Sequence, residues 1–183
     1  MRKIMLVVCA GLLCIGCGGS KTQKPIDQSG MPDFVLNPPK QAGVLFGTGI
    51  AEQQNMQLAK ETADLRARKE IATVLSTKVA NMLKDYMGQA GIGSQAEVTE
   101  LVQSVTRAIS EVELVGVTIE KREYINGKMY SLGKLALDNS IKDLITKSVN
   151  NSLSSKEALL SQFRAKQGFE ELDKQLEKMK VSE

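Results

Sequence analysis

The sequence Val44-Leu-Phe-Gly-Thr-Gly-Ile-Ala51 and the helix-forming stretch after it decide the fold of this chain. Larger residues alternate with small ones along these eight positions, which predicts a short buried strand. From about Asn55 to Met87, the apolar residues recur with the period of one long helix. One stripe of this helix begins with small residues and continues with larger ones: Ala59, Ala63, Ala67, Ile71, Leu75, Val79 and Leu83. The glycines of the strand and the alanines of the helix predict close packing of the two backbones.

The motif Gly47-Thr48-Gly49 also resembles the start of a dinucleotide-binding fingerprint. However, Glu52 occupies the position of the third glycine, and no βαβ unit with a downstream ribose-binding acid follows. We therefore expect no nucleotide site at this motif.

A second helix is predicted after a glycine-rich break at Gly88, Gly91 and Gly93. Ser94 and Glu97 have the spacing of a capping box, which marks the start of this helix. Its apolar positions follow at helical spacing: Val98, Leu101, Val102, Val105, Ile109 and Val112. On the first helix, a separate face carries charged residues four apart, which predicts a solvated ladder of weak ion pairs at Lys60, Asp64 and Arg68.

Residues 113–137 predict a β-hairpin around Asn126-Gly127. A two-residue turn would pair Ile119 with Lys134 and mix apolar and polar side chains on each face. A three-residue turn over residues 125–127, with a bulge, pairs Ile119 with Gly133 and keeps one face apolar at its base. The sequence favours this second register. It also pairs Val115 with Leu137 and Val117 with Leu135, and it leaves a polar face made of Thr118, Glu120, Arg122, Tyr130 and Lys134.

The remaining chain predicts two helices. Asp138 or Asn139 caps the first, which a polar segment at residues 150–152 would end. Ser154 and Glu157 have capping-box spacing and would start the final helix. Its apolar seam extends over only about two heptads: Ala165, Phe169, Leu172, Leu176 and Met179. The seam fits either an internal docking helix or a surface for self-association.

The first residues have the layout of a secretory signal peptide. Arg2 and Lys3 precede an apolar run that is too short to span a bilayer and that ends at Gly16-Cys17. A small residue just before a cysteine resembles a bacterial lipobox, and Cys17 is therefore the predicted lipidation site. Cys9 and Cys14 follow bulky residues and fit that pattern poorly.

These signals divide the chain into four parts. Residues 1–16 form the predicted signal peptide, and residues 17–43 form a lipidated tether with all four prolines. Within the tether, residues 31–39 are expected to pack on the domain as an extended strap through Phe34, Val35 and Leu36. Residues 44–150 are the expected α+β domain, in which a long helix and a second helix pack on a small antiparallel or mixed sheet of one strand plus a hairpin. Residues 151–183 supply the C-terminal amphipathic helix.

The composition excludes several kinds of site. The 183-residue chain has no histidine, and signal cleavage with lipidation of Cys17 would leave no free thiol. Ser-His-Asp and Cys-His catalytic pairs and histidine- or cysteine-based zinc sites are thereby excluded. Without Arg2 and Lys3 the formal net charge falls from +3 to about +1, and aromatic residues make up 4%. Both values argue against nucleic-acid binding. We therefore predict no catalytic residue, no cofactor and no metal site.

The order of these features resembles a family of small bacterial outer-membrane lipoproteins typified by a twenty-kilodalton antigen. That family includes the lipoprotein of the flagellar basal disk of some curved bacteria. The resemblance covers about residues 31–150 and implies a non-catalytic, often oligomeric α+β domain. It is carried by Pro32-Asp-Phe-Val35, Asn37-Pro-Pro39, Phe46-Gly-Thr-Gly-Ile-Ala51, the alanine stripe with Arg66 and Arg68, and Tyr130-Ser-Leu-Gly-Lys-Leu135.

The expected function follows from the anchor and the resemblance. Gly18 stands where an aspartate would retain the protein at the inner membrane, so we expect anchoring in the outer membrane, facing the periplasm or, alternatively, the cell surface. The expected role is structural or in assembly, with flagellar basal-disk or motility structures as its most specific form. Expected partners are outer-membrane lipid through Cys17, further copies of the chain, and flagellar or envelope proteins. The alternative is a periplasmic small-ligand-binding or envelope enzyme domain without a recognisable catalytic motif.

Overall fold

The computed structural model describes residues 30–111 and 116–181 of the chain. It is an α+β fold, as the sequence predicts, with one three-stranded antiparallel sheet in the order β1-β3-β2. Cys17, Val112 and Val115 lie outside the described residues, and so does the predicted pair of Val115 with Leu137. The elements are α1 (Asp33–Leu36), β1 (Val44–Glu52), α2 (Met56–Ala90), α3 (Gln95–Glu111), β2 (Thr118–Ile125), β3 (Lys128–Ala136), α4 (Asn139–Ser154), α5 (Glu157–Ala165) and α6 (Gly168–Val181).

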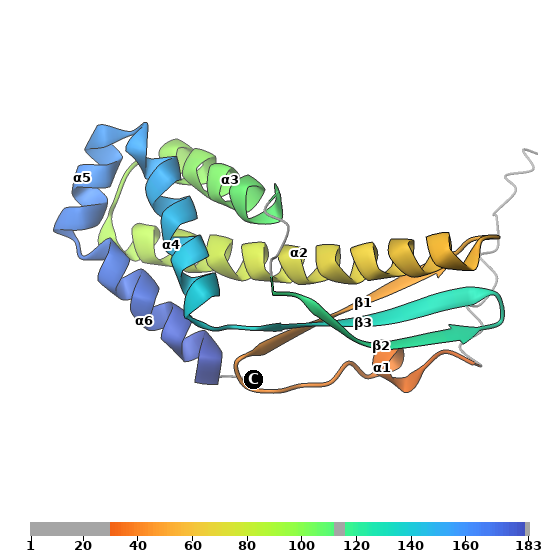
Figure 1. Ribbon diagram of the computed structural model, residues 1–183. Helices are drawn as coiled ribbons and strands as arrows, with labels where there is room; N and C mark the ends of the chain where they lie inside the picture. Colours follow the sequence, from red (N-terminus) through yellow and green to blue (C-terminus); the bar gives the residue numbers. More distant parts are fainter. Residues whose placement is uncertain (1–29, 112–115, 182–183) are drawn as a thin grey trace, which may run out of the picture.

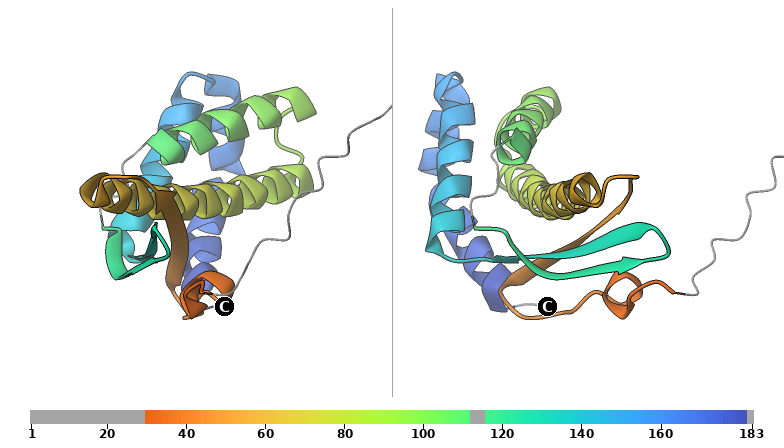
Figure 2. Two further views of the ribbon diagram at one scale, coloured as in Figure 1. Left: turned by 90° about the vertical axis from the view of Figure 1, so that its right-hand side faces the viewer. Right: turned by 45° about the vertical axis from the view of Figure 1, so that its right-hand side comes forward.

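Helix α2 runs along most of the length of the molecule, and its two halves contact different elements (Figure 1). The sheet lies beneath the N-terminal half, and α3 lies on the opposite side of α2 from the sheet (Figure 2). Helices α4, α5 and α6 gather around the C-terminal half. The largest cluster of buried apolar side chains therefore lies between helices, with α2, α3, α4, α5 and α6 all contributing to it.

The glycines of β1 allow α2 to approach the sheet closely, which confirms the prediction from the sequence. A Cβ atom on Gly49 would lie 1.9 Å from the backbone oxygen of Ala63, and one on Gly47 would lie 2.7 Å from that of Ala67. The predicted stripe is buried along its whole length, because Ala59, Ala63, Ala67, Ile71, Leu75, Val79 and Leu83 are each at most 1% exposed. Small residues thus face the sheet, and larger ones fill the core between the helices.

The predicted extended strap is wrong in conformation. Residues Asp33–Leu36 form the single helical turn α1, which is closed by hydrogen bonds from Asn37 to the backbone and side-chain oxygens of Asp33. Pro38 disfavours helical geometry at Asn37, so the turn ends there. The segment does pack on the domain: Phe34 is buried against Tyr130 and Leu132, on the sheet face opposite α2, while Leu36 stays exposed.

The hairpin combines features of both predicted registers. Ile125 pairs with Lys128 across a two-residue turn in which Asn126 and Gly127 both have positive φ, as a type I′ turn requires. The predicted three-residue turn is therefore wrong. The predicted pair of Ile119 with Gly133 is nevertheless present, because the register shifts between Ile119 and Lys121. The bulge lies six residues before the turn, not at Gly127.

Helices α2 and α3 match the sequence prediction closely, apart from one glycine. Asn55 caps α2 by accepting hydrogen bonds from the N–H groups of Gln57 and Leu58. The helix runs through Gly88 and ends at Ala90, where Gly91 caps it with a φ of 64°, so Gly88 is not a break. The predicted capping box is present, because the Glu97 carboxylate accepts from the Ser94 N–H at 2.7 Å.

The C-terminal helices differ most from the sequence prediction. Asp138 rather than Asn139 caps α4, which continues through the predicted polar break at residues 150–152. The hydroxyl of Ser154 donates to the Asn151 carbonyl instead of forming a capping box. The single final helix is in fact two, α5 and α6, divided at Gln167, which has a φ of 60°. A boundary at residue 150 would therefore fall inside α4.

The apolar seam of the final segment is partly buried in the core: Phe169 and Met179 are half-buried, and Ala165 is exposed. Leu172 and Leu176 of α6 are 4% and 5% exposed, and Phe163 of α5 is fully buried between Tyr86 and Phe169. Of the two roles open from the sequence, the structure supports internal docking. Lys142 of α4 adds ion pairs to Asp173 and Glu177 that hold α6 in place.

Candidate functional site

The Gly47-Thr48-Gly49 motif has a structural role in this fold. Its glycines lie against the α2 backbone. The Thr48 N–H and hydroxyl both donate to the Glu70 carboxylate, a negative group that a phosphate would have to displace. The motif therefore serves the packing of α2 on β1.

Side chains of α2 occupy part of the free edge of β1. The Leu137 N–H donates to the Gly43 carbonyl. The backbone N–H and C=O groups of the odd-numbered residues of β1 therefore bond to β3, and those of the even-numbered residues point away from β3, toward the free edge. Two of these outward groups have partners on α2, because Glu70 accepts from Thr48 N–H and Arg66 donates to the Ile50 carbonyl. The β1 edge is therefore partly satisfied within the chain and poorly suited to pairing with another strand.

The strongest polar cluster joins α2 to the hairpin. Asp64 accepts two hydrogen bonds from Arg122 Nε and one from Arg122 Nη2, the last at 2.8 Å, and it accepts a further one from the Ser131 hydroxyl at 2.7 Å. Ser131 is fully buried, and the Asp64 side chain is 18% exposed. Nearby, Arg68 donates to the Val117 carbonyl at 2.7 Å. The predicted solvated ladder is therefore wrong for Asp64 and Arg68, which make tertiary contacts.

The same cluster corrects the predicted polar face of the hairpin. Arg122 and Ser131 point toward α2, whereas Tyr130 is buried beneath α1 on the opposite face. A sequence signal for the cluster does exist. Asp64 and Arg68 directly follow Ala63 and Ala67, so close packing of the alanines brings these polar neighbours within reach of the sheet.

The cluster makes stability depend on pH through Asp64. Burial raises the pKa of Asp64, but hydrogen bonds from Arg122 and Ser131 and the Arg122 charge outweigh burial and hold the pKa below the usual 3.8. A lowered carboxylate pKa stabilises the fold above the unfolded-state value, and this stability is lost as the pH falls through the folded-state value.

We expect Asp64→Asn to lower the free energy of unfolding by about 1–2 kcal/mol at neutral pH, because the charged hydrogen bonds to Arg122 are weakened. The difference from wild type should shrink as the pH falls below the usual Asp pKa of 3.8, where wild-type Asp64 also becomes protonated. Urea titrations at neutral pH and at a pH below 3.8 measure this difference in the free energy of unfolding. Asp85→Asn, at an exposed position on the same helix, is the control. An Asp64→Asn deficit that is undiminished in acid would contradict this role of the carboxylate.

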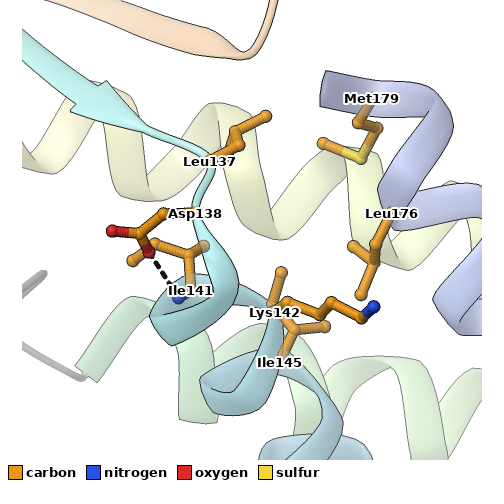
Figure 3. Close-up of a pocket in the computed structure, with 7 residues that line it drawn as sticks. All are labelled: Leu137, Asp138, Ile141, Lys142, Ile145, Leu176 and Met179. Carbon is orange, nitrogen blue, oxygen red and sulfur yellow. Dashed lines mark hydrogen bonds between the residues drawn. The ribbon is translucent and has the colours of Figure 1, made fainter. Parts of the chain in front are cut away.

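Two pockets in the described part of the chain lie beside α4. One lies between the first turn of α4 and the end of α6 and holds about 10 Å³, room for about one water molecule (Figure 3). Its lining is mostly apolar: Leu137, Asp138, Ile141, Lys142, Ile145, Leu176 and Met179. A larger, open hollow of about 460 Å³ lies along α4, over Ser140, Asp143, Leu144, Lys147, Ser148 and Asn151.

Residues 30–111 and 116–181 contain neither a cluster of metal-ligand residues nor a membrane-spanning helix. In these ranges, no group of three or more histidine, cysteine, aspartate or glutamate residues could hold a metal ion. No helix within them is both long enough and apolar enough to cross a bilayer.

The sequence-predicted lipidation site, Cys17, lies outside the described residues, and the polar cluster at Asp64 is the main feature that sequence reasoning missed. Comparison of the chain with protein-family models, with curated proteins and with solved structures finds no match.

Proposed function

We propose that the protein is a lipoprotein anchored in the outer membrane through Cys17, with a structural or assembly role in the periplasm. The observation that carries this proposal is the position of Cys17, at the end of an apolar run and directly after Gly16. Acyl chains on this cysteine would each add about 0.8 kcal/mol of membrane affinity per buried CH₂, so several chains give stable anchoring. The described domain begins at Gly30, thirteen residues later.

The assembly role includes self-association, and the fold narrows the surfaces available for it. Leu172 and Leu176 of the α6 seam are buried in the core, and Arg66 and Glu70 bind part of the β1 edge. Of the surfaces that the sequence suggests for self-association, the edge of β2 remains available. Strand β2 is exposed along most of its length, but its bulge and charged side chains disfavour extended pairing, so we expect only weak contacts there. Confinement to a membrane surface raises the effective concentration of the chain and strengthens such contacts.

The most specific form of the proposal is a part in a flagellar basal disk or another motility structure. It is supported by the resemblance of residues 31–150 to the lipoprotein family described above. Deletion of the gene is then expected to impair motility, and the protein is expected to copurify with flagellar basal bodies.

The experiment for the anchor is metabolic labelling with radioactive palmitate. Cys17→Ser is expected to abolish labelling and to leave the uncleaved precursor, because no acceptor thiol remains at the cleavage site. Cys14→Ser is the matched control and should be labelled and cleaved like wild type. Labelling that persists in Cys17→Ser and disappears in Cys14→Ser would move the anchor to Cys14.

A further inference from the structure

The most exposed large apolar side chains all belong to the elements of the sheet half of the domain. Among the described residues, the large apolar side chains with the greatest exposure are Leu36, Met56, Leu58, Leu65 and Tyr124. All five belong to α1, to the first three turns of α2 or to β2, and none belongs to α3, α4, α5 or α6. Met56 and Leu58 are 57% and 49% exposed, and they lie in the first turn of α2, beside the fully buried Ala59.

The chain enters the domain at the end where α2 begins. Gly30 lies beside the hairpin turn, since a Cβ on it would be 3.1 Å from the Asn126 side chain. Lys128, just after that turn, is the register partner of Glu52 in the sheet and forms an ion pair with it. Helix α2 begins at Met56, four residues after Glu52. Figure 1 shows the β2–β3 turn and the start of α2 at one end of the molecule, far from α5, with α1 set back beneath the hairpin.

The distance to the anchor is limited by chain length. Because an extended chain spans at most about 3.6 Å per residue, Cys17 and Gly30 can be no more than roughly 45 Å apart. A lipid at Cys17 would therefore keep the entry end of the domain within roughly 45 Å of the bilayer. Exposed apolar side chains at that end are suited to the boundary between headgroups and acyl chains.

We propose that Met56 and Leu58, in the first turn of α2, form a membrane-contact surface that orients the domain with its entry end on the phospholipid bilayer. This inference rests on the proposed anchor at Cys17. Isolated apolar contacts of this size bind membranes weakly, but the anchor confines them to the bilayer surface and raises their effective concentration. Glu52 and Lys60 flank the patch in the sequence with opposite charges, so the neighbouring charges do not favour anionic lipid over phosphatidylcholine.

The experiment uses two features of the sequence. The chain has no tryptophan, and after signal removal Cys17 is its single cysteine. The mature chain from Cys17, carrying Leu58→Trp, is coupled through Cys17 to a maleimide lipid in phosphatidylcholine vesicles. Brominated phosphatidylcholine then serves as a contact quencher of the tryptophan. Ser155→Trp, at an exposed position between α4 and α5, is the matched control at the far end of the domain.

The expected result is that bromolipid removes most of the fluorescence of Leu58→Trp and leaves that of Ser155→Trp unchanged. Equal quenching at both positions, or none at either, would overturn the proposed orientation. An unquenched Leu58→Trp emission that shifts to the blue as the protein density rises would instead assign the patch to a second copy, and it would also overturn the proposal. Because the anchor is attached chemically, failure of this test is distinguishable from failure of Cys17 lipidation in cells.

Discussion

Gly49→Ala is expected to lower the free energy of unfolding of the domain by about 3 kcal/mol or more, which is the upper range for overpacking a core. The added Cβ would lie 1.9 Å from the Ala63 backbone oxygen and 2.6 Å from the Ala67 nitrogen. Both contacts are with backbone, which no side-chain rotation can move. Helix α2 would have to lift from β1, and the close packing along the alanine stripe would be lost.

Gly88→Ala is the matched control for this prediction. Gly88 lies within α2, and a Cβ on it would have no neighbour within 4 Å. Alanine at this position should stabilise the helix by up to about 1 kcal/mol. Urea denaturation followed by circular dichroism measures both variants. If Gly49→Ala were as stable as wild type, the close contact between β1 and α2 would be incorrect.

A chain that ends at Ser155 is expected to lose cooperative folding, because it lacks α5 and α6. These helices contribute four buried core residues that contact the other helices: Leu159, Phe163, Leu172 and Leu176. Their removal would expose the apolar faces of α2 and α4. The measurement is a thermal melt followed by circular dichroism.

A point variant separates this effect from the general damage of a truncation. Phe163→Ala should cost about 3–5 kcal/mol, since Phe163 is fully buried between Tyr86 and Phe169. Leu160→Ala, in the same helix but only partly buried, should cost clearly less. A truncated chain that melts cooperatively near the wild-type temperature would show that α5 and α6 are dispensable.

The sequence predicts the elements of this fold whose signals are local. The alternation in β1, the alanine stripe of α2 and the Ser94 capping box each appear within one segment, and all three are present in the structure. The turn at Asn126-Gly127 was mispredicted for a physical reason. Both residues tolerate positive φ, which suits a two-residue turn, and the apolar pairing is restored by a bulge at a distance from it.

The errors in the remaining elements arise from tertiary contacts. Polar residues at positions 150–152 suggest a break, but Ser152 faces inward and hydrogen-bonds Ser104 of α3, so the helix continues. In the sequence, Asp64 has the pattern of a solvated charge. Its partner Arg122 lies in the hairpin, more than fifty residues later, and only the fold brings the two together. Periodicity within one helix cannot reveal a partner that only the fold brings near.

We propose that the mature protein begins at a lipid-modified Cys17. Mass spectrometry of the N-terminal peptide, from protein isolated from the membranes of the cells that make it, is the decisive measurement. The expected peptide starts at Cys17 and carries the mass of a diacylglyceryl group. A protein that retains Met1, or whose first residue is unmodified and lies elsewhere, would rule out the lipid anchor.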